Sequence, residues 1–284
     1  MRIPVAALQM GPCSEDREAN VARGIALIKE AARQGARVVV LPEMFNTIFF
    51  AVEVMEDFDH FFETVPGPTS DQLGAVAREY GITVIAGISE KSVAGRYYNS
   101  VVVIGSDGEI SGTYRKTHLP LIISPPERVT YERSYFSPGD LGLPVFEVDG
   151  LKIGVLICYD RHFPEAFRTL ADRGADFIVV PTGARTWCAS WRSGIWECLL
   201  RTRAYENGVF IVAANRAGVE RGTAYLGDSM VVSPTGGTIL ARAEQDSLDA
   251  VVLAECDLDE LTSFRATVPF RRDLRPEIYS RPTN

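Results

Sequence analysis

The stretch LKIGVLICYDRHFPE, residues 151–165, decides the fold that we expect for this chain. An apolar run of β-forming character ends abruptly at Cys158 and is followed by the polar residues YDRH, after which Pro164 is expected to open a helix. A strand that delivers a thiol to a strand-to-helix turn holds the sulfur from below and leaves it exposed near helix N–H groups, as a nucleophile requires. The alternative is a buried cysteine that serves as a small hydrophobic residue.

Composition indicates a globular protein with ample core. The chain has 284 residues, 46% of them hydrophobic, and a net charge of −8. That charge argues against nucleic acid or an anionic membrane as the main partner, although local arginines still allow an anionic small substrate. The N-terminus contains no secretory segment, and no apolar stretch is long enough to cross a membrane, so we expect a cytoplasmic protein.

Cysteine and histidine usage gives no sign of a metal or a disulfide framework. The five cysteines are odd in number and scattered, which suits a reducing compartment. The three histidines show no metal-binding spacing. We therefore expect neither a metal nor another cofactor.

Strand-like and helix-like segments alternate along most of the chain. Apolar runs followed by glycine or proline predict strands, and amphipathic segments between them predict helices. The predicted strands include residues 3–9, 37–41, 82–88, 98–104, 109–114, 152–157, 176–180 and 209–214, and the predicted helices residues 16–34, 164–173 and 187–207. Residues 120–138 lack periodicity and are predicted to form a long loop.

The sequence contains an internal echo. GARVVVLP, residues 35–42, recurs as GADFIVVP, residues 174–181, and EYGITVIAG, residues 79–87, resembles ENGVFIVAA, residues 206–214. Two similar α/β halves predict two sheets packed face to face between helical layers. No linker divides the halves, so residues 1–284 are interpreted as a single domain.

Two segments allow more than one interpretation. Residues 45–62 contain six phenylalanines and form either a lid or pocket wall, or a loop packed on the core or at a subunit contact. Residues 269–284 contain several arginines and prolines and are predicted to form an extended arm, which we place at a subunit interface.

Three reactive side chains follow predicted strands. Glu43 and Cys158 lie where buried strands end, and Lys116 follows the second strand of a hairpin. In parallel sheets, functional groups gather at the carboxyl ends of strands. Each residue also has an ordinary explanation: Glu43 as a turn cap, Lys116 as a solvated strand end and Cys158 as core.

The motifs that surround these three residues favour a catalytic role over the ordinary explanations. VVVLPE, YRKTHLP and LICYDRHFPE closely resemble the signatures of the nitrilase superfamily of carbon–nitrogen hydrolases, in the same order and with similar spacing from residue 3 to about residue 276. YERSYFSPGD is similar to the family segment that carries a second glutamate, here Glu132, and NRAG (215–218) and SPTGG (233–237) also resemble family segments. The resemblance implies a four-layer α-β-β-α subunit of two mixed sheets that assembles into homodimers or larger homo-oligomers.

Physical reasoning and the resemblance assign the same catalytic roles. Cys158, made a thiolate with the help of Glu43 and Lys116, would attack a carbonyl carbon. Lys116 and the backbone N–H of Tyr159 would hold the oxyanion. Glu43 would protonate the departing ammonia or amine and activate the water that breaks the thioester. Glu132 would hydrogen-bond Lys116 and fix its position.

The residues after the nucleophile guide the choice of substrate. Arg161 suits bidentate carboxylate capture, and CYDRHFPE resembles the turn of β-ureidopropionases and N-carbamoyl-D-amino acid amidohydrolases. We therefore expect an N-carbamoyl amino acid, with His162, His118 and Thr182 completing the pocket. A structural salt bridge from Arg161 to Glu165 or Asp160 is the competing interpretation. The second group of relatives has two arginines where this chain has Arg161 and His162, and the first differs at Asp160.

Other functions remain open at this stage. Within the superfamily, the rivals are hydrolysis of a simple amide, a nitrile or N-carbamoylputrescine, the last of which is cationic and would favour acidic residues near the site. A glutaminase that passes ammonia to a synthetase would need a separate partner protein. A binding or redox protein would bury Cys158 without using it.

Overall fold

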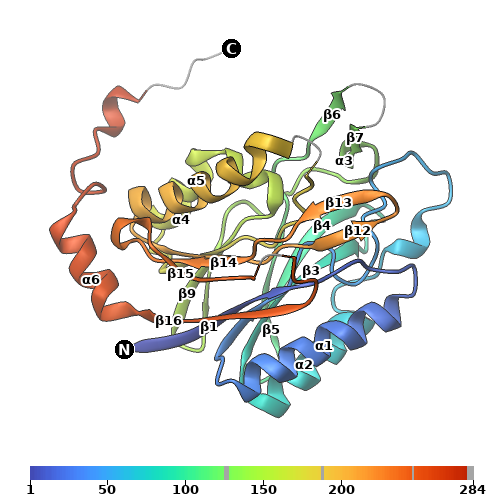
Figure 1. The fold of residues 1–284 in the computed structure, drawn as a ribbon, viewed down its shortest axis with the longest axis horizontal. Helices are drawn as coiled ribbons and strands as arrows, with labels where there is room; N and C mark the ends of the chain where they lie inside the picture. Colours follow the sequence, from blue (N-terminus) through green and yellow to red (C-terminus); the bar gives the residue numbers. More distant parts are fainter. Residues whose placement is uncertain (125–127, 187–188, 245, 280–284) are drawn as a thin grey trace.

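Two six-stranded sheets form the centre of the computed structural model, which describes residues 1–284 except 125–127, 187–188, 245 and 280–284 (Figure 1). The first sheet has the order β16-β1-β2-β3-β4-β5. Its strands are β1 (Arg2–Gln9), β2 (Val38–Val40), β3 (Thr83–Lys91), β4 (Tyr97–Ile104), β5 (Ile110–Arg115) and β16 (Ala250–Asp257). The second sheet has the order β15-β14-β11-β10-β9-β8. Its strands are β8 (Val145–Val148), β9 (Leu151–Val155), β10 (Phe177–Val179), β11 (Phe210–Ala213), β14 (Met230–Val232) and β15 (Ile239–Arg242).

Helices cover the outer faces of both sheets (Figure 1). The pair α1 (Arg17–Arg33) and α2 (Pro68–Tyr80) packs on the first sheet, and the pair α4 (Pro164–Asp172) and α5 (Ala189–Asn207) packs on the second. The predicted four-layer α-β-β-α architecture is therefore confirmed. The first two residues of the helix predicted over 187–207 lie outside the described part of the chain.

The internal echo corresponds to equivalent positions in the two sheets. Strand β2 lies parallel between β1 and β3, and β10 lies parallel between β9 and β11. Both echo segments therefore end at the carboxyl edge of a three-stranded parallel centre, where side chains after the strands can meet.

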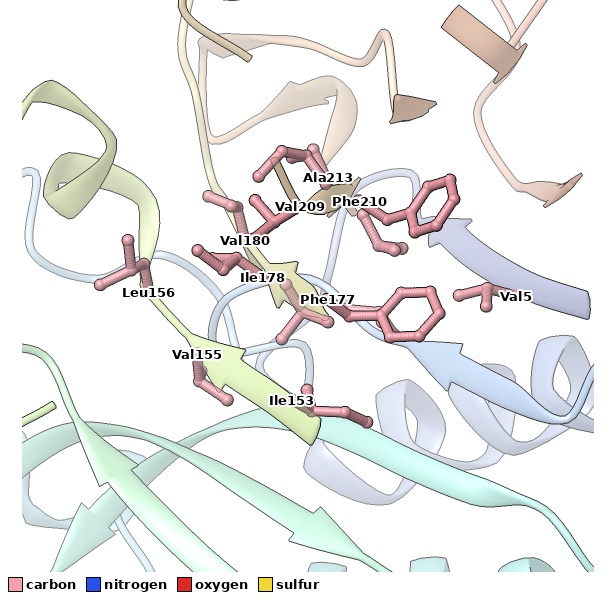
Figure 2. Packing of buried hydrophobic residues seen from close by; sticks show 14 of the residues in the cluster. Val5, Ile153, Val155, Leu156, Phe177, Ile178, Val180, Val209, Phe210 and Ala213 are labelled. Atoms are coloured by element: carbon pink, nitrogen blue, oxygen red, sulfur yellow. The ribbon is translucent and has the colours of Figure 1, made fainter. Parts of the chain in front are cut away.

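Alternation of side chains along the strands builds the two main cores. On β2, Val38 and Val40 point into the core between the sheets, whereas Val39 points toward α1 and α2. Figure 2 shows Phe177 and Phe210 on neighbouring strands of the second sheet, with Val5 of the first sheet near their rings. The two rings stack with centroids 5.4 Å apart.

Within the segment 120–138, the described residues, which exclude 125–127, include regular structure that the sequence analysis did not predict. Two short strands, β6 (Leu121–Ser124) and β7 (Arg128–Tyr131), pair as a hairpin, and the helix α3 (Glu132–Tyr135) follows. The prediction was wrong because these four-residue strands pair only with each other and have no long apolar pattern. The hairpin matters because it leads directly into Glu132.

The phenylalanine-rich segment 45–62 packs inside the subunit. It forms an aromatic cluster with residues of the segment that contains α3. Phe50 stacks on Phe61 at 4.8 Å and contacts Tyr135 and Phe136 at 5.2 and 5.8 Å between centroids. The hydroxyl of Tyr135 also donates to the carbonyl of Glu53. Of the interpretations considered, the structure favours a loop packed on the core.

The chain after α6 (Leu258–Thr267) leaves the two sheets and extends along one side of the molecule (Figure 1). Its described part includes a single short helix, η4 (Pro276–Ile278), and exposes Phe270, Ile278 and Tyr279. An arm at a subunit interface stays a prediction. Among the described helices, none is both long and apolar enough to cross a membrane.

We predict that Phe50→Ala lowers the free energy of unfolding by about 3–5 kcal/mol, because it leaves a cavity among four aromatic rings. Urea denaturation followed by circular dichroism measures this change. Val93→Ala is the matched control, since Val93 is fully exposed and its truncation removes no buried contact. Equal stability of the two variants would contradict the role of Phe50 in the aromatic cluster.

Candidate active site

Cys158 lies directly beyond β9, where the strand turns into a short 3-10 helix, η2 (Cys158–His162). Its backbone has φ +44°, a left-handed conformation that side-chain-bearing residues rarely adopt. Its N–H donates to the carbonyl of Pro181 at the end of β10. A strained residue held by two neighbouring strands is a common arrangement at functional sites.

A buried ammonium joins two carboxylates beside this turn. Lys116, which directly follows β5, lies 2.7 Å from Glu43 Oε1 and 2.7 Å from Glu132 Oε2 through its Nζ. All three side chains are buried, with exposed fractions of 0–2%. Cys158 and Glu43 act on each other, since Cys158 helps to lower the pKa of the Glu43 carboxyl and the Glu43 charge raises the pKa of the thiol. The structure thus brings together the four side chains for which the sequence predicted a catalytic role.

Two further donors fix the Glu43 carboxylate. Asn99 on β4 donates through Nδ2 to Oε1 at 2.7 Å, and the backbone N–H of Gly183 donates to Oε2 at 2.9 Å. A Cβ at Gly183 would lie 3.2 Å from that same oxygen, so the close approach favours glycine. Glu43 and Gly183 follow β2 and β10, the two echo strands, and meet at the junction of the sheets.

Burial and mutual charge shift the pKa values of Glu43 and Glu132 in opposite directions. Burial raises the pKa of Glu43, but the charge of Lys116 and the hydrogen bonds to Lys116, Asn99 and Cys158 outweigh it and hold the pKa below its ordinary value. Burial, with the nearby Glu43 charge, raises the pKa of Glu132 to about 7 against the opposing effect of Lys116. Burial alone would lower the pKa of Lys116, yet Glu132 and Glu43 raise it above its usual range.

Burial and nearby charges act on the pKa of the Cys158 thiol. Burial is the largest effect that raises the pKa of Cys158, and the negative charge of Glu43 raises it further, while Lys116 and Arg161 oppose them only in part. Formation of a thiolate at Cys158 with the help of Glu43 and Lys116 stays a prediction, and the raised pKa means that the thiol must lose its proton against the effect of burial. The lowered pKa of Glu43 keeps this neighbouring carboxyl in the form that can accept a proton.

The oxyanion donors have the freedom that their predicted role needs. Within the described hydrogen bonds, Lys116 uses two of its three N–H groups on carboxylates. The backbone N–H of Tyr159 has no acceptor among the described residues. Both groups are thus available to a developing negative charge beside the sulfur.

Asp160 braces the site through hydrogen bonds that the sequence analysis did not predict. It is fully buried and accepts hydrogen bonds from the N–H of Ile157, the hydroxyl of Tyr114 and the N–H of His118, at 2.8–3.0 Å. Its Oδ1 also lies 2.7 Å from His118 Nδ1. Asp160 therefore braces the nucleophile turn against the segment that follows Lys116.

Arg161 bends back over its own turn. Its Nη1 donates to the carbonyl of Cys158 at 2.7 Å and lies 3.5 Å from the sulfur. The guanidinium carbon lies 5.5 Å from the ring of Trp196. In the described ion pairs, Arg161 has no partner in Glu165 or Asp160, so the salt-bridge interpretation is wrong. Capture of a substrate carboxylate stays a prediction.

The remaining predicted pocket residues have different settings. His118 stacks on Phe163 at 3.6 Å and lines, with Tyr159, a cavity of about 490 Å³. His162 lies near the ring of Tyr159, with centroids 5.3 Å apart. Thr182 is fully buried and its hydroxyl donates to the carbonyl of Val180, which is a structural contact. Substrate contacts from these residues stay predictions.

Some signals for the overlooked residues were present in the sequence. Asn99 lies in a strand that is otherwise apolar toward its end, and Asp160 follows the nucleophile within two positions. A polar residue in a buried strand needs a partner, which here is Glu43. In the described chain, no group of three His, Cys, Asp or Glu residues is arranged to hold a metal ion.

We predict that Glu43→Gln shifts the pH profile of Cys158 alkylation by iodoacetamide to lower pH. The substitution removes the negative charge of Glu43, which raises the thiol pKa. Mass spectrometry must resolve the site, because Cys198 is exposed and will also react. Cys198 provides the internal control, since its profile should be the same in both proteins. A shift of Cys158 to higher pH would contradict the charge arrangement.

Comparison with known proteins agrees with this geometry. Residues 4–266 match the family model for carbon–nitrogen hydrolases. The chain is 39% identical over 257 residues to a nitrilase of Pyrococcus abyssi, covering 90% of each chain, and 34% identical to the N-carbamoylputrescine amidase of Solanum lycopersicum, covering 98% of this chain and 93% of that one. A carbon–nitrogen hydrolase structure from Helicobacter pylori superposes with a TM-score of 0.89 at 30% identity, covering 98% and 97% of the two chains. The chain therefore belongs to the carbon–nitrogen hydrolase family of the nitrilase superfamily, enzymes that hydrolyse carbon–nitrogen bonds other than peptide bonds.

Proposed function

We propose that this enzyme hydrolyses an N-carbamoyl amino acid, of the N-carbamoyl-β-alanine or N-carbamoyl-D-amino acid type, through a covalent thioester on Cys158. The observation that supports the chemistry is the buried cluster of Lys116 between Glu43 and Glu132, whose charges act on the thiol of Cys158. The products would be the amino acid, ammonia and CO₂. A carbonyl flanked by nitrogen is a weak electrophile, so a nucleophile, a base and a stabilised oxyanion are all needed.

The first half of the reaction forms the thioester. Glu43 accepts the thiol proton while Sγ of Cys158 bonds to the carbonyl carbon. The carbonyl oxygen becomes an oxyanion that Lys116 Nζ and the Tyr159 N–H stabilise. As the tetrahedral intermediate collapses, the C–N bond breaks and Glu43 returns the proton to the departing ammonia or amine.

The second half releases the enzyme. Glu43, again ionised, takes a proton from water, and the resulting hydroxide attacks the thioester carbon. The C–S bond breaks, the proton returns to the sulfur, and a carbamic acid is released. The carbamic acid then decomposes to CO₂ and the remaining amine, which breaks the second C–N bond. Glu132 holds Lys116 at 2.7 Å throughout, so that the ammonium meets the oxyanion in both halves.

The proposed carboxylate end of the substrate rests on Arg161. Arg161 Nη1 lies 3.5 Å from the sulfur, so its guanidinium brings positive charge next to the nucleophile, and a guanidinium is suited to pair with a carboxylate. The nitrilase and the N-carbamoylputrescine amidase among the relatives give the alternatives. Nitriles, simple amides and N-carbamoylputrescine are therefore the competing substrates.

A substrate panel tests the proposal. We expect ammonia release to be fastest from N-carbamoyl-β-alanine or an N-carbamoyl-D-amino acid, and slower from N-carbamoylputrescine, simple amides and nitriles. Cys158→Ala should lower kcat by about 10³-fold or more, because no covalent intermediate can form. Cys198→Ala is the matched control and should keep full activity, since Cys198 is exposed on α5. Turnover of only the cationic or neutral compounds would overturn the substrate assignment.

Arg161→Met separates carboxylate binding from bracing of the turn. If Arg161 binds the substrate carboxylate, kcat/KM for N-carbamoyl-β-alanine should fall about 10- to 100-fold more than kcat/KM for a neutral amide. If Arg161 only holds the Cys158 carbonyl, both substrates should lose activity equally, which would contradict carboxylate binding. Arg173→Met serves as the control, because Arg173 is an exposed arginine at the end of α4.

A further inference from the structure

A second buried cation lies beneath the site and takes no part in the reaction just described. Arg216 belongs to the NRAG segment between β11 and β12 (Ala217–Glu220) and is 1% exposed. Its Nη1 forms an ion pair with Glu220 Oε2 at 2.7 Å, and the Glu220 side chain is 3% exposed. A fully buried ion pair is seldom a net source of stability, because desolvation offsets the attraction.

The hydrogen-bonding groups of Arg216 and Glu220 that the ion pair does not use bind the backbone of residues 43–49. Arg216 donates to the carbonyls of Glu43 at 3.2 Å, Met44 at 2.5 Å and Thr47 at 2.6 Å. The other partner, Glu220, accepts from the N–H of Phe49 at 2.6 Å. One further bond, from the N–H of Cys13 to Glu220, ties down the loop after β1. The pair thus binds residues 43–49 through three backbone carbonyls and one backbone N–H.

Residues 43–49 adopt a backbone conformation that contacts from other segments must stabilise. Met44, the residue after Glu43, has φ +47°, a conformation that costs about 1–3 kcal/mol for a residue with a side chain. On the other side, a Cβ at Gly87 would lie 2.7 Å from the N atom of Met44 and from the carbonyl oxygen of Pro42. The backbone around Glu43 is therefore pressed against β3 and kept there from below by Arg216.

We propose that the Arg216–Glu220 pair is a positioning unit for Glu43, and this rests on the proposed role of Glu43 as proton carrier. The pair fixes the backbone, Asn99 and the Gly183 N–H fix the carboxylate, and together they set the distance between Glu43 and the sulfur. A displacement of about 1 Å in a reacting group can cost about 10²-fold in rate.

Charge gives a second readout. Arg216 and Glu43 attract each other, so loss of the guanidinium should raise the pKa of Glu43. The ionisable groups that face Glu43 are Lys116, Glu132 and Cys158, and those that face Arg216 are Glu220, Cys13 and Tyr225. Loss of Arg216 would raise the pKa of Cys13 and of Tyr225 still further, away from the acid range. The acid limb of the kcat/KM profile should therefore follow Glu43 and move to higher pH.

The test uses the full-length enzyme, its best substrate from the panel and three variants. Arg216→Lys keeps the positive charge but removes the planar set of guanidinium donors. We expect kcat to fall about 10- to 100-fold, while KM and the pH of the acid limb change little. Arg216→Met should lower kcat further and shift the limb upward. The double variant R216M/E220L replaces the pair by apolar groups of similar volume, which should restore much of the thermal stability without restoring kcat.

Matched controls make each outcome decisive. Arg203→Met removes another buried arginine, paired with Glu206 on α5, and should lower stability without changing the pH profile. Recovery of kcat in the double variant, or normal kcat and pH profile in Arg216→Met, would overturn the inference. Full activity in Glu43→Gln would instead overturn the proposed role of Glu43 itself.

Discussion

The placement of one ammonium between two carboxylates governs this site. Lys116 has no contact with water, so its charge can exist only because Glu43 and Glu132 surround it. The same neutralisation keeps Glu43 ionised in a position where burial alone would protonate it. The lowered pKa keeps Glu43 in the form that can accept a proton, and burial shields the carboxylate from bulk water. The rest of the fold can be understood as the means of keeping these three groups together.

The two halves of the chain supply complementary parts of that arrangement. The first sheet provides Glu43, Asn99 and Lys116, and the second provides Cys158 and the Gly183 N–H. Because β2 and β10 occupy equivalent places in their sheets, the carboxylate of one half meets the backbone of the other. The site therefore lies at the junction between two similar units, and neither unit contains a complete set of groups.

Much of this could be predicted because the signals are local. An apolar run that ends in Cys158 or Glu43 marks a strand end, and the echo marks equivalent strands. The setting of residues 45–62 could not be predicted, since Phe50 meets Tyr135 only in the folded chain. The direction of the Arg161 side chain and the raised pKa of the Cys158 thiol also depend on burial and rotamer, which sequence patterns do not report.

The hydrogen bonds from Arg216 and Glu220 to residues 43–49 link the first part of the chain to a part that is synthesised much later. Glu43 is synthesised early, but the side chains that hold its backbone leave the ribosome only after three-quarters of the chain has been made. A polypeptide that ends before residue 216 lacks the Arg216–Glu220 pair and also β16, which pairs with β1 along its whole length. The ordered base therefore depends on segments from both ends of the chain.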